Sequence, residues 1–299
     1  MTRRGERNHA LFETVTLLGC GLLGGSIALA ARNALPDTAV RIWARREATL
    51  QYAREHGFSQ LTYTDLEEAV RGAQLVILAT PIAAFQELAE RMLPALDRDA
   101  IVTDIGSVKA YVHRTTGAWL AGRGCCFIGS HPMAGTEFTG IENAFDDLLM
   151  GATVAVTNPH GASADQLARL EAFWQGIGCS TYRMDPVHHD QAVARISHVP
   201  HILAGLCART AVAGEVPRAN LQRLAASGFR DTTRVCSGPS GMWADILWEN
   251  DSAIRATLQD CVADLHHLIY LLEIQDKAAV QNWLETATAA RHDIRKKQM

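Results

Sequence analysis

Lysine is scarce in this sequence of 299 residues, where it occurs only as Lys109, Lys277, Lys296 and Lys297. Lys and Arg together number 28 against 32 Asp and Glu, which gives a formal net charge of −4. The chain therefore lacks the basic surplus that is typical of nucleic-acid-binding proteins, and we expect no nucleic-acid partner.

Cysteine is present without a pattern. The seven residues are scattered and no C-x-x-C pair occurs, which argues against a disulfide framework or a zinc ribbon. No apolar run approaches the ~20 residues that a membrane-spanning helix needs, and the polar first ten residues lack the apolar core of a signal peptide. We expect a soluble, cytoplasmic protein with reduced thiols and no membrane partner.

Short apolar strands alternate with helices over the first 185 residues. The first strand covers residues 15–18 and leads into an Ala/Leu-rich helix. Further strands are predicted over residues 39–45, 74–81, 99–109, 125–132, 152–159 and 179–184. The alternation predicts an α/β fold with a doubly wound, mainly parallel sheet.

Helical periodicity replaces the strands in the last third of the chain. Residues 185–212 and 241–294 carry apolar side chains at helical spacing, and no strand signal interrupts them. We predict two domains, an α/β domain over residues 13–185 and an all-helical domain over residues 186–299. The long helices carry more apolar surface than one small bundle hides, so a homodimer is expected.

A glycine-rich turn joins the first strand to its helix in the pattern G-x-G-x-x-G. Its cofactor-binding candidates are Gly19, Gly21, Leu22, Leu23 and Gly24. Between a strand and a helix, the first glycine allows a tight turn, the second lets the backbone approach a pyrophosphate, and the third lets the two elements pack closely. The helix N-terminus attracts the phosphates. A turn without a ligand is the alternative, but the context favours a dinucleotide-binding Rossmann domain.

The end of the second strand bears on the choice of cofactor. NAD enzymes usually carry an Asp or Glu there for the ribose hydroxyl, whereas this strand ends in Ala44, Arg45 and Arg46. A guanidinium group suits a 2′-phosphate, so NADP is favoured over NAD. A solvated charged turn is the alternative, and Glu47 could serve the ribose of NAD.

Three further strand ends carry polar residues, in the segments "LATP", "DIGSVK" and "GSHPMAG". Ligands of such sheets bind beyond the carboxyl ends of the strands, so Thr80, Pro81, Ser107 and His131 are expected beside the nicotinamide. A neutral histidine at that place can accept a hydroxyl proton as hydride leaves.

His131 keeps two other interpretations, a structural histidine or a metal ligand. Other histidines gather later in the sequence at His188, His189, His198 and His201. No Cys or carboxylate spacing completes a zinc set around them, so no metal is expected.

Three more residues are open to two interpretations each. Ser107 could bond substrate or cofactor, or cap a helix that begins at Val108. Lys109 could be a catalytic base or a surface group. Arg234 could bind a substrate carboxylate bidentately, or form a surface ion pair within its own loop.

Several segments together resemble the prephenate/arogenate dehydrogenase family of tyrosine biosynthesis. They run in family order from about residue 15 to 250 and read "GCGLLGGSIALA", "LATP", "DIGSVK", "GSHPMAGTE", "ISHVPH" and "GFRDTTRV…MWADILWEN". The resemblance implies oxidative decarboxylation of prephenate or arogenate, with hydride passing from ring C4 to the nicotinamide. The product would be 4-hydroxyphenylpyruvate or tyrosine. A helical second domain that forms a dimer is also implied.

The resemblance further implies roles for individual residues. His131 resembles the catalytic group that bonds the 4-hydroxyl, and Ser107 the serine that helps to position it. Arg234 resembles the arginine that holds a substrate carboxylate. The other substrate-binding candidates are His198, His201, Glu137, Trp243 and Asp231.

Two other functions are compatible with the same two-domain architecture. A β-hydroxyacid or imine-type reductase would place a catalytic Lys, Asp or Tyr on an interdomain helix, but no lysine occurs between Lys109 and Lys277. A non-catalytic NADP-sensing protein would need the glycine loop but not Ser107, His131 and Arg234 together.

Overall fold

The computed structural model describes residues 11–295. The polar N-terminal segment and the end of the basic C-terminal tail lie outside this range. The chain divides into two compact units after Asn250, and each is described by itself. In the part of the chain that the structure describes, no helix combines the length and the apolar character needed to cross a membrane.

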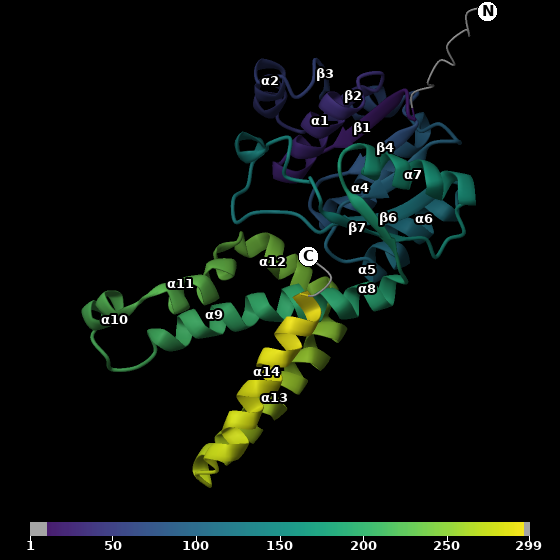
Figure 1. Ribbon diagram of the computed structural model, residues 1–299. Coiled ribbons are helices and arrows are strands. Elements are labelled where there is room, and N and C mark those ends of the chain that lie inside the picture. Colours follow the sequence, from purple (N-terminus) through teal and green to yellow (C-terminus); the bar gives the residue numbers. More distant parts are fainter. Residues whose placement is uncertain (1–10, 296–299) are drawn as a thin grey trace, which may run out of the picture. The chain divides into compact units, whose positions relative to one another are not determined.

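The first unit is built on one eight-stranded sheet in the order β3-β2-β1-β4-β5-β6-β7-β8 (Figure 1). The strands are β1 (Thr14–Leu18), β2 (Ala39–Trp43), β3 (Leu61–Tyr63), β4 (Leu75–Leu78), β5 (Ile101–Asp104), β6 (Cys126–Pro132), β7 (Thr153–Thr157) and β8 (Ser180–Arg183).

Helices connect these strands and then continue the chain alone. Those between strands are α1 (Leu22–Ala34), α2 (Glu47–Glu55), α3 (Leu66–Val70), η1 (Ile82–Ala84), α4 (Phe85–Met92), η2 (Leu93–Ala95), α5 (Ala110–Val112), η3 (His113–Gly117), α6 (Ala118–Ala121), η4 (Ile141–Asn143) and α7 (Ala164–Gly176). Those after the last strand are α8 (Pro186–Val193), η5 (Ala194–His198), α9 (Val199–Ala211), α10 (Arg218–Leu224), α11 (Ser227–Thr233), η6 (Arg234–Ser237) and α12 (Ser240–Glu249).

The sheet is mainly parallel, as predicted, and it reverses once. Strands β1 to β6 run parallel, β7 pairs antiparallel with β6, and β8 runs parallel to β7. The sequence analysis did not identify this reversal, because the apolar pattern of a strand carries no information about its direction.

Several elements were not predicted, among them strand β3 and helix α2. Strand β3 has only three residues at the sheet edge, with Leu61 exposed. Helix α2 is short, and only Leu50 and Ala53 of its residues are buried. Both segments are too short and too polar to give a clear periodic signal.

Apolar side chains cover both faces of the sheet, as a doubly wound fold requires. Along β1, Val15 and Leu17 pack into one cluster with residues of α1 and α7, and Leu18 packs into the other with residues of α3 and α4. This alternation follows the two-residue period of a strand. Because both faces of the sheet are covered by apolar side chains, polar groups that bind a ligand must lie in the loops at the strand ends.

The second unit is a helical hairpin of α13 (Asp251–Glu273) and α14 (Lys277–Arg295). The turn contains Gln275 at φ 57, and Trp283 Nε1 donates to Asp264 Oδ1 at 3.0 Å. The second half of helix α13 bears exposed apolar residues at Val262, Leu265, Ile269 and Leu272. These residues form the apolar stripe on which the predicted homodimer was based.

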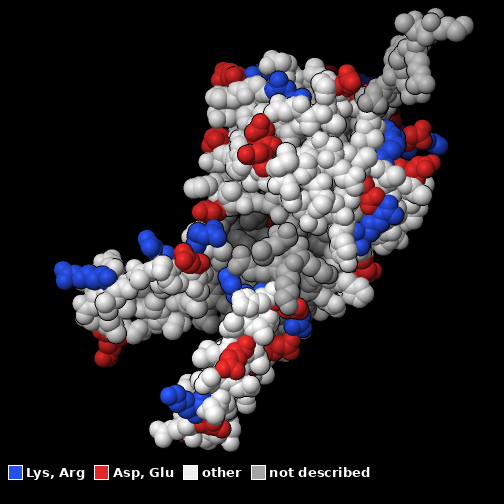
Figure 2. Space-filling view, in the orientation of Figure 1, with Lys and Arg blue, Asp and Glu red and all other residues white. Residues whose placement is uncertain are grey.

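The predicted domain boundary after residue 185 stays a prediction. Strands end at Arg183 and helices follow from Pro186, whereas the compact units divide after Asn250. On the face drawn in Figure 2, acidic and basic side chains of the described residues are interspersed without a broad patch of one sign.

An ion pair is fully buried where β5 leads into its exit loop. The Lys109 Nζ group bonds to Asp104 Oδ2, and neither side chain is exposed. Burial raises the pKa of Asp104 and lowers the pKa of Lys109, and each partner opposes the shift of the other. Such a pair adds little net stability, but removing one partner leaves an uncompensated buried charge.

We expect Asp104→Ala to lower the free energy of unfolding by about 3–5 kcal/mol, because it isolates the Lys109 ammonium group. The double variant Asp104→Leu/Lys109→Met should lose less than either single change. Urea unfolding at one fixed protein concentration measures the differences, with Asp99→Ala at an exposed position as the control. A loss of under about 0.5 kcal/mol for Asp104→Ala would contradict this account.

Candidate functional site

Three neighbouring cavities follow the carboxyl ends of the parallel strands. One of 990 Å³ lies at the glycine turn and the end of β2, the next of 410 Å³ lies over the start of α1, and the third of 540 Å³ contains His131. The first two share Gly21, Thr80 and Pro81, and the last two share Ser107. The predicted cofactor and catalytic residues therefore line one continuous series of cavities.

The three glycines of the turn meet the requirements of a dinucleotide loop in different ways. Gly19 has φ +111, and a Cβ atom there would lie 2.7 Å from the Ala79 carbonyl oxygen. A Cβ at Gly24 would lie 2.5 Å from the Gly19 oxygen, so that close approach needs glycine. A Cβ at Gly21 would meet no protein atom within 4 Å. Packing does not require Gly21, which leaves its backbone free to approach a ligand.

The charged side chains at the end of β2 lie at the largest cavity. Arg45 and Arg46 line it and are exposed, and Glu142 of η4 also lines it. Glu47, the alternative group for a ribose, instead bonds to Arg54 Nη2 at 2.6 Å. The groups next to the strand end are thus predominantly cationic.

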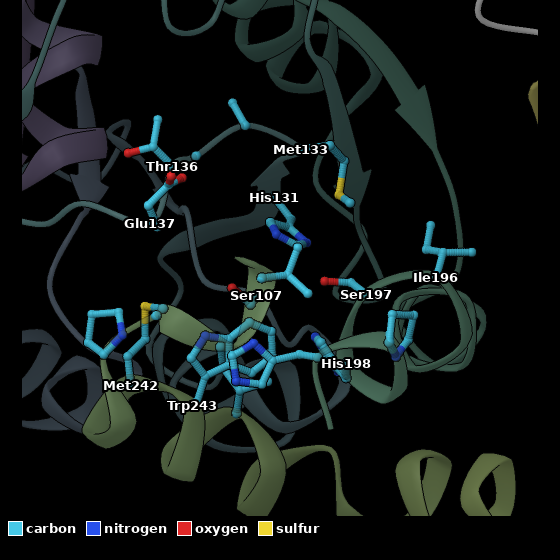
Figure 3. Close-up of a pocket in the computed structure, with 18 of the residues that line it drawn as sticks. Ser107, His131, Met133, Thr136, Glu137, Ile196, Ser197, His198, Met242 and Trp243 are labelled. Carbon is cyan, nitrogen blue, oxygen red and sulfur yellow. The ribbon is translucent and has the colours of Figure 1, made fainter. Parts of the chain in front are cut away.

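The His131 cavity is enclosed by the end of β6, the loop after β5, η5, α9 and α12. Figure 3 shows the His131 ring pointing into it, with Ser107 nearby and Trp243 across from both. On the opposite side of β6, Ser130 is fully buried and bonds to Thr103 Oγ1 at 2.8 Å and Trp174 Nε1 at 3.1 Å. The alternation along the strand directs Ser130 into the core and His131 into the cavity.

His131 bonds to a second histidine that lies behind it. Its Nδ1 is 2.9 Å from His189 Nε2, and His189 Nδ1 is 2.7 Å from Asp190 Oδ1. Burial lowers the pKa of His131 well below its usual range, so the ring is neutral at pH 7. A neutral imidazole is able to accept a proton.

Ser107 does not cap a helix. Helix α5 begins at Ala110, its N-cap position is Lys109, and the N–H groups of these two residues bond to the Asp190 carboxylate and not to Ser107. Ser107 is half-buried and faces both inner cavities. Lys109 is neither a surface group nor a free base, because it is buried and paired with Asp104.

The opposite wall of the cavity carries two more histidines. The His201 ring stacks on Trp243 at 3.5 Å between centroids, and His198 Nδ1 accepts from Asn250 Nδ2 at 3.1 Å. Burial lowers the pKa of His198 to about 4 and also lowers the pKa of His201. This wall therefore offers uncharged hydrogen-bonding and aromatic groups.

Arg234 and Glu137 supply the charged pair of the cavity. Both line it, and Arg234 Nη1 lies 3.5 Å from Glu137 Oε2. The guanidinium side chain is 61% exposed, so it is open to an incoming anion. Asp231, in contrast, is exposed on α11 and is not among the residues that line this cavity.

From the sequence, His189 was a candidate only for metal binding, and Asp190 was not a candidate for any role. The segment "HHD" at 188–190 contains both, and only the fold shows that His189 and Asp190 point inward while His188 is exposed. Among the described residues, no group of three or more His, Cys, Asp or Glu side chains is arranged to hold a metal ion.

Family models match nearly the whole chain. The nucleotide-binding domain of prephenate dehydrogenase matches residues 27–183, and the dimerization domain of prephenate dehydrogenase matches residues 185–286. The chain belongs to the prephenate dehydrogenase family. The family and the fold class predicted from the sequence are confirmed.

Known members of the prephenate dehydrogenase family align along most of the chain. A cyclohexadienyl dehydrogenase of Zymomonas mobilis is 32% identical over 292 residues, covering 95% of this chain and 99% of that protein. The structure of A. aeolicus prephenate dehydrogenase with hydroxyphenyl propionate and NAD+ is 27% identical, with a TM-score of 0.87 over 94% of this chain and 98% of that one. Synechocystis arogenate dehydrogenase is 30% identical, with a TM-score of 0.82 over 94% and 99% of the two chains.

These matches bear on the cofactor and on the assembly. The nucleotide-binding domain supports the predicted nicotinamide cofactor, and the dimerization domain supports the predicted homodimer. A preference of this prephenate dehydrogenase family member for NADP over NAD stays a prediction, as do the roles of its individual site residues.

We expect Gly21→Ala and Gly24→Ala to separate ligand approach from packing. Gly24→Ala should cost about 1–3 kcal/mol of stability through its clash with the Gly19 carbonyl. Gly21→Ala should change stability by under about 0.5 kcal/mol, yet weaken dinucleotide binding at least about tenfold because its methyl group occupies the ligand's path. Urea unfolding and dinucleotide titration measure the two effects. Unchanged dinucleotide affinity in Gly21→Ala would contradict the proposed approach of the backbone to a pyrophosphate.

Proposed function

We propose that this protein oxidatively decarboxylates prephenate, arogenate or both, using a nicotinamide dinucleotide as hydride acceptor. One observation carries the proposal: His131, Ser107 and Arg234 line one cavity, and Ser107 also faces the cavity of the glycine loop. The reacting ring would lie where these two cavities join, with the adenosine half of the cofactor at the arginine-rich end.

The fit of the dinucleotide rests on the open space above Gly21 and on the amino end of α1. The glycine loop would hold the pyrophosphate, and Thr80, Pro81 and Ser107 would lie beside the nicotinamide. When bound, the oxidised nicotinamide supplies the site that accepts hydride.

His131 acts as the proton acceptor in the proposed reaction. It takes the proton of the ring 4-hydroxyl as hydride leaves C4, and its neutral state at pH 7 leaves it free to do so. Ser107 positions the same hydroxyl. Loss of CO₂ from C1 then leaves its electron pair in the ring, which becomes aromatic and supplies the driving force. The phenolate oxygen formed at C4 takes the proton back from His131, and 4-hydroxyphenylpyruvate or tyrosine results.

Arg234 holds a substrate carboxylate from the other side of the cavity. Its existing partner Glu137 keeps the guanidinium at the rim until the carboxylate replaces or joins it. His198, His201 and Trp243 contribute uncharged contacts to the ring and the side chain. Asp231, which lies outside the cavity lining, would act only by orienting its neighbours.

The turnover of prephenate and arogenate, each with NAD+ and NADP+, tests the function. We expect release of CO₂ and formation of reduced dinucleotide with at least one pair. His131→Asn should lower kcat by about 10²–10⁴-fold while dinucleotide affinity changes little, because Asn keeps the donor toward His189 but lacks the atom that accepts the proton. His188→Asn, at an exposed neighbour of the network, is the control.

Two results would overturn these assignments. Binding of the dinucleotide without turnover of either substrate would favour the non-catalytic sensor over the enzyme. Full kcat in His131→Asn would remove His131 from the mechanism while leaving the enzyme assignment in place.

We further propose NADP as the preferred cofactor, with Arg45 and Arg46 at the 2′-phosphate. The ion pair of Glu47 with Arg54 supports this, since it engages the carboxylate that directly follows the two arginines in the sequence, and Glu47 does not line the cavity. Glu142 lines the same cavity and would favour the uncharged 2′-hydroxyl of NAD, so the two arginines must outweigh it.

Arg45→Ala and Arg46→Ala should each raise the KM for NADP+ by about tenfold and leave that for NAD+ within about twofold, since only NADP+ carries the phosphate. Initial-rate kinetics with both dinucleotides measure the ratio. Equal losses for the two cofactors would count against a 2′-phosphate contact.

A further inference from the structure

We infer that His189 and Asp190 are positioning residues for the proposed proton acceptor, fixing which ring nitrogen of His131 faces the substrate. The inference rests on the proposed function and deepens it. Neither residue is among those that line the His131 cavity, and both are almost fully buried, with exposures of 1% and 4%.

The protonation pattern of the network follows from its anchor. Asp190 Oδ1 accepts from the Lys109 backbone N–H at 2.7 Å, and Asp190 Oδ2 accepts from the Ala110 N–H at 2.8 Å. A carboxylate offers only acceptors, so His189 Nδ1 must carry the proton that points to Asp190. In a neutral His189 ring, Nε2 is then unprotonated and accepts from His131 Nδ1–H.

This arrangement assigns the reactive atom of His131. With Nδ1 donating to His189, the lone pair is on Nε2 and is available to the substrate 4-hydroxyl. When Nε2 takes the proton, the imidazolium keeps its bond to His189, and the Asp190 carboxylate behind it offsets the new positive charge. The opposite tautomer of His131 would present an N–H to the hydroxyl and could not accept its proton.

Asp190 also fixes the loop that carries Ser107. Its two oxygens hold the first N–H groups of α5, directly after the segment Gly106–Val108. Asn250 Nδ2 donates to the Asp190 carbonyl oxygen at 2.9 Å and to His198 Nδ1 at 3.1 Å, which links the backbone of Asp190 to the far wall of the cavity. One carboxylate thus places both His131 and Ser107 relative to α8.

The experiment compares His189→Leu, His189→Gln and Asp190→Asn with the exposed control His188→Leu, in the full-length enzyme. We expect His189→Leu to lower kcat by about 10²-fold, with KM and dinucleotide affinity within about twofold, because the tautomer and not the binding surface is altered. His189→Gln should recover at least about tenfold, because its amide oxygen can accept from His131 Nδ1–H. Asp190→Asn should lower kcat at least about tenfold, because one amide oxygen replaces two acceptors.

A double-mutant cycle decides whether the effect acts through His131. In the His131→Asn background, His189→Leu should cause no further loss of kcat, because the group that it positions is already gone. Equal losses in both backgrounds, or no recovery by His189→Gln, would show a merely structural role and overturn the inference. If His189→Leu does not fold, the double-mutant cycle with His131→Asn is measured with His189→Gln and with Asp190→Asn instead. The same criterion then applies, namely whether either change lowers kcat further in the His131→Asn background.

The proposed function and the inference about His189 and Asp190 would be contradicted by different results. If the wild-type protein turns over neither prephenate nor arogenate, the proposed function fails. If the wild-type protein is active and His189→Leu keeps the wild-type kcat, only the inference about His189 and Asp190 fails.

Discussion

The carboxylate of Asp190 is the constraint on which the rest of the site depends. It belongs to α8, it binds the first backbone N–H groups of α5, and through His189 it reaches His131 at the end of β6. Three elements far apart in the sequence are therefore held by one buried group. Because burial makes each unmade bond costly, the three groups that bond to this carboxylate must stay in place together.

The same edge of the sheet contains a second buried polar contact, between Asp104 and Lys109. This pair engages Lys109, and no other lysine occurs among residues 11–276, so that described segment has no unpaired lysine for the chemistry of a hydroxyacid or imine reductase. In the proposed reaction, His131 therefore transfers the proton, and its low pKa keeps it neutral. The proposal assigns the positive charge for the substrate carboxylate to a separate group, Arg234 at the exposed rim of the cavity.

Local rules explain why so much of the fold was predictable. The glycine pattern, the apolar strands and the change to helical periodicity are all short-range signals, and they gave the α/β domain, the helical region and the cofactor loop. The direction of β7 was not predictable because it depends on which neighbour pairs with it. Helix α2 and strand β3 were missed because each buries too few side chains to set a period.

The sequence by itself determined the family, the dinucleotide loop and the candidates His131, Ser107 and Arg234, because each lies in a segment whose local chemistry is distinctive. Only the tertiary structure decided what these groups contact. It placed Asp231 outside the cavity lining, buried Lys109, and set His189 behind His131 across 58 residues of chain. The physical reason is that a hydrogen bond between distant segments leaves no periodic trace in the sequence. It exists only after the sheet and α8 have packed.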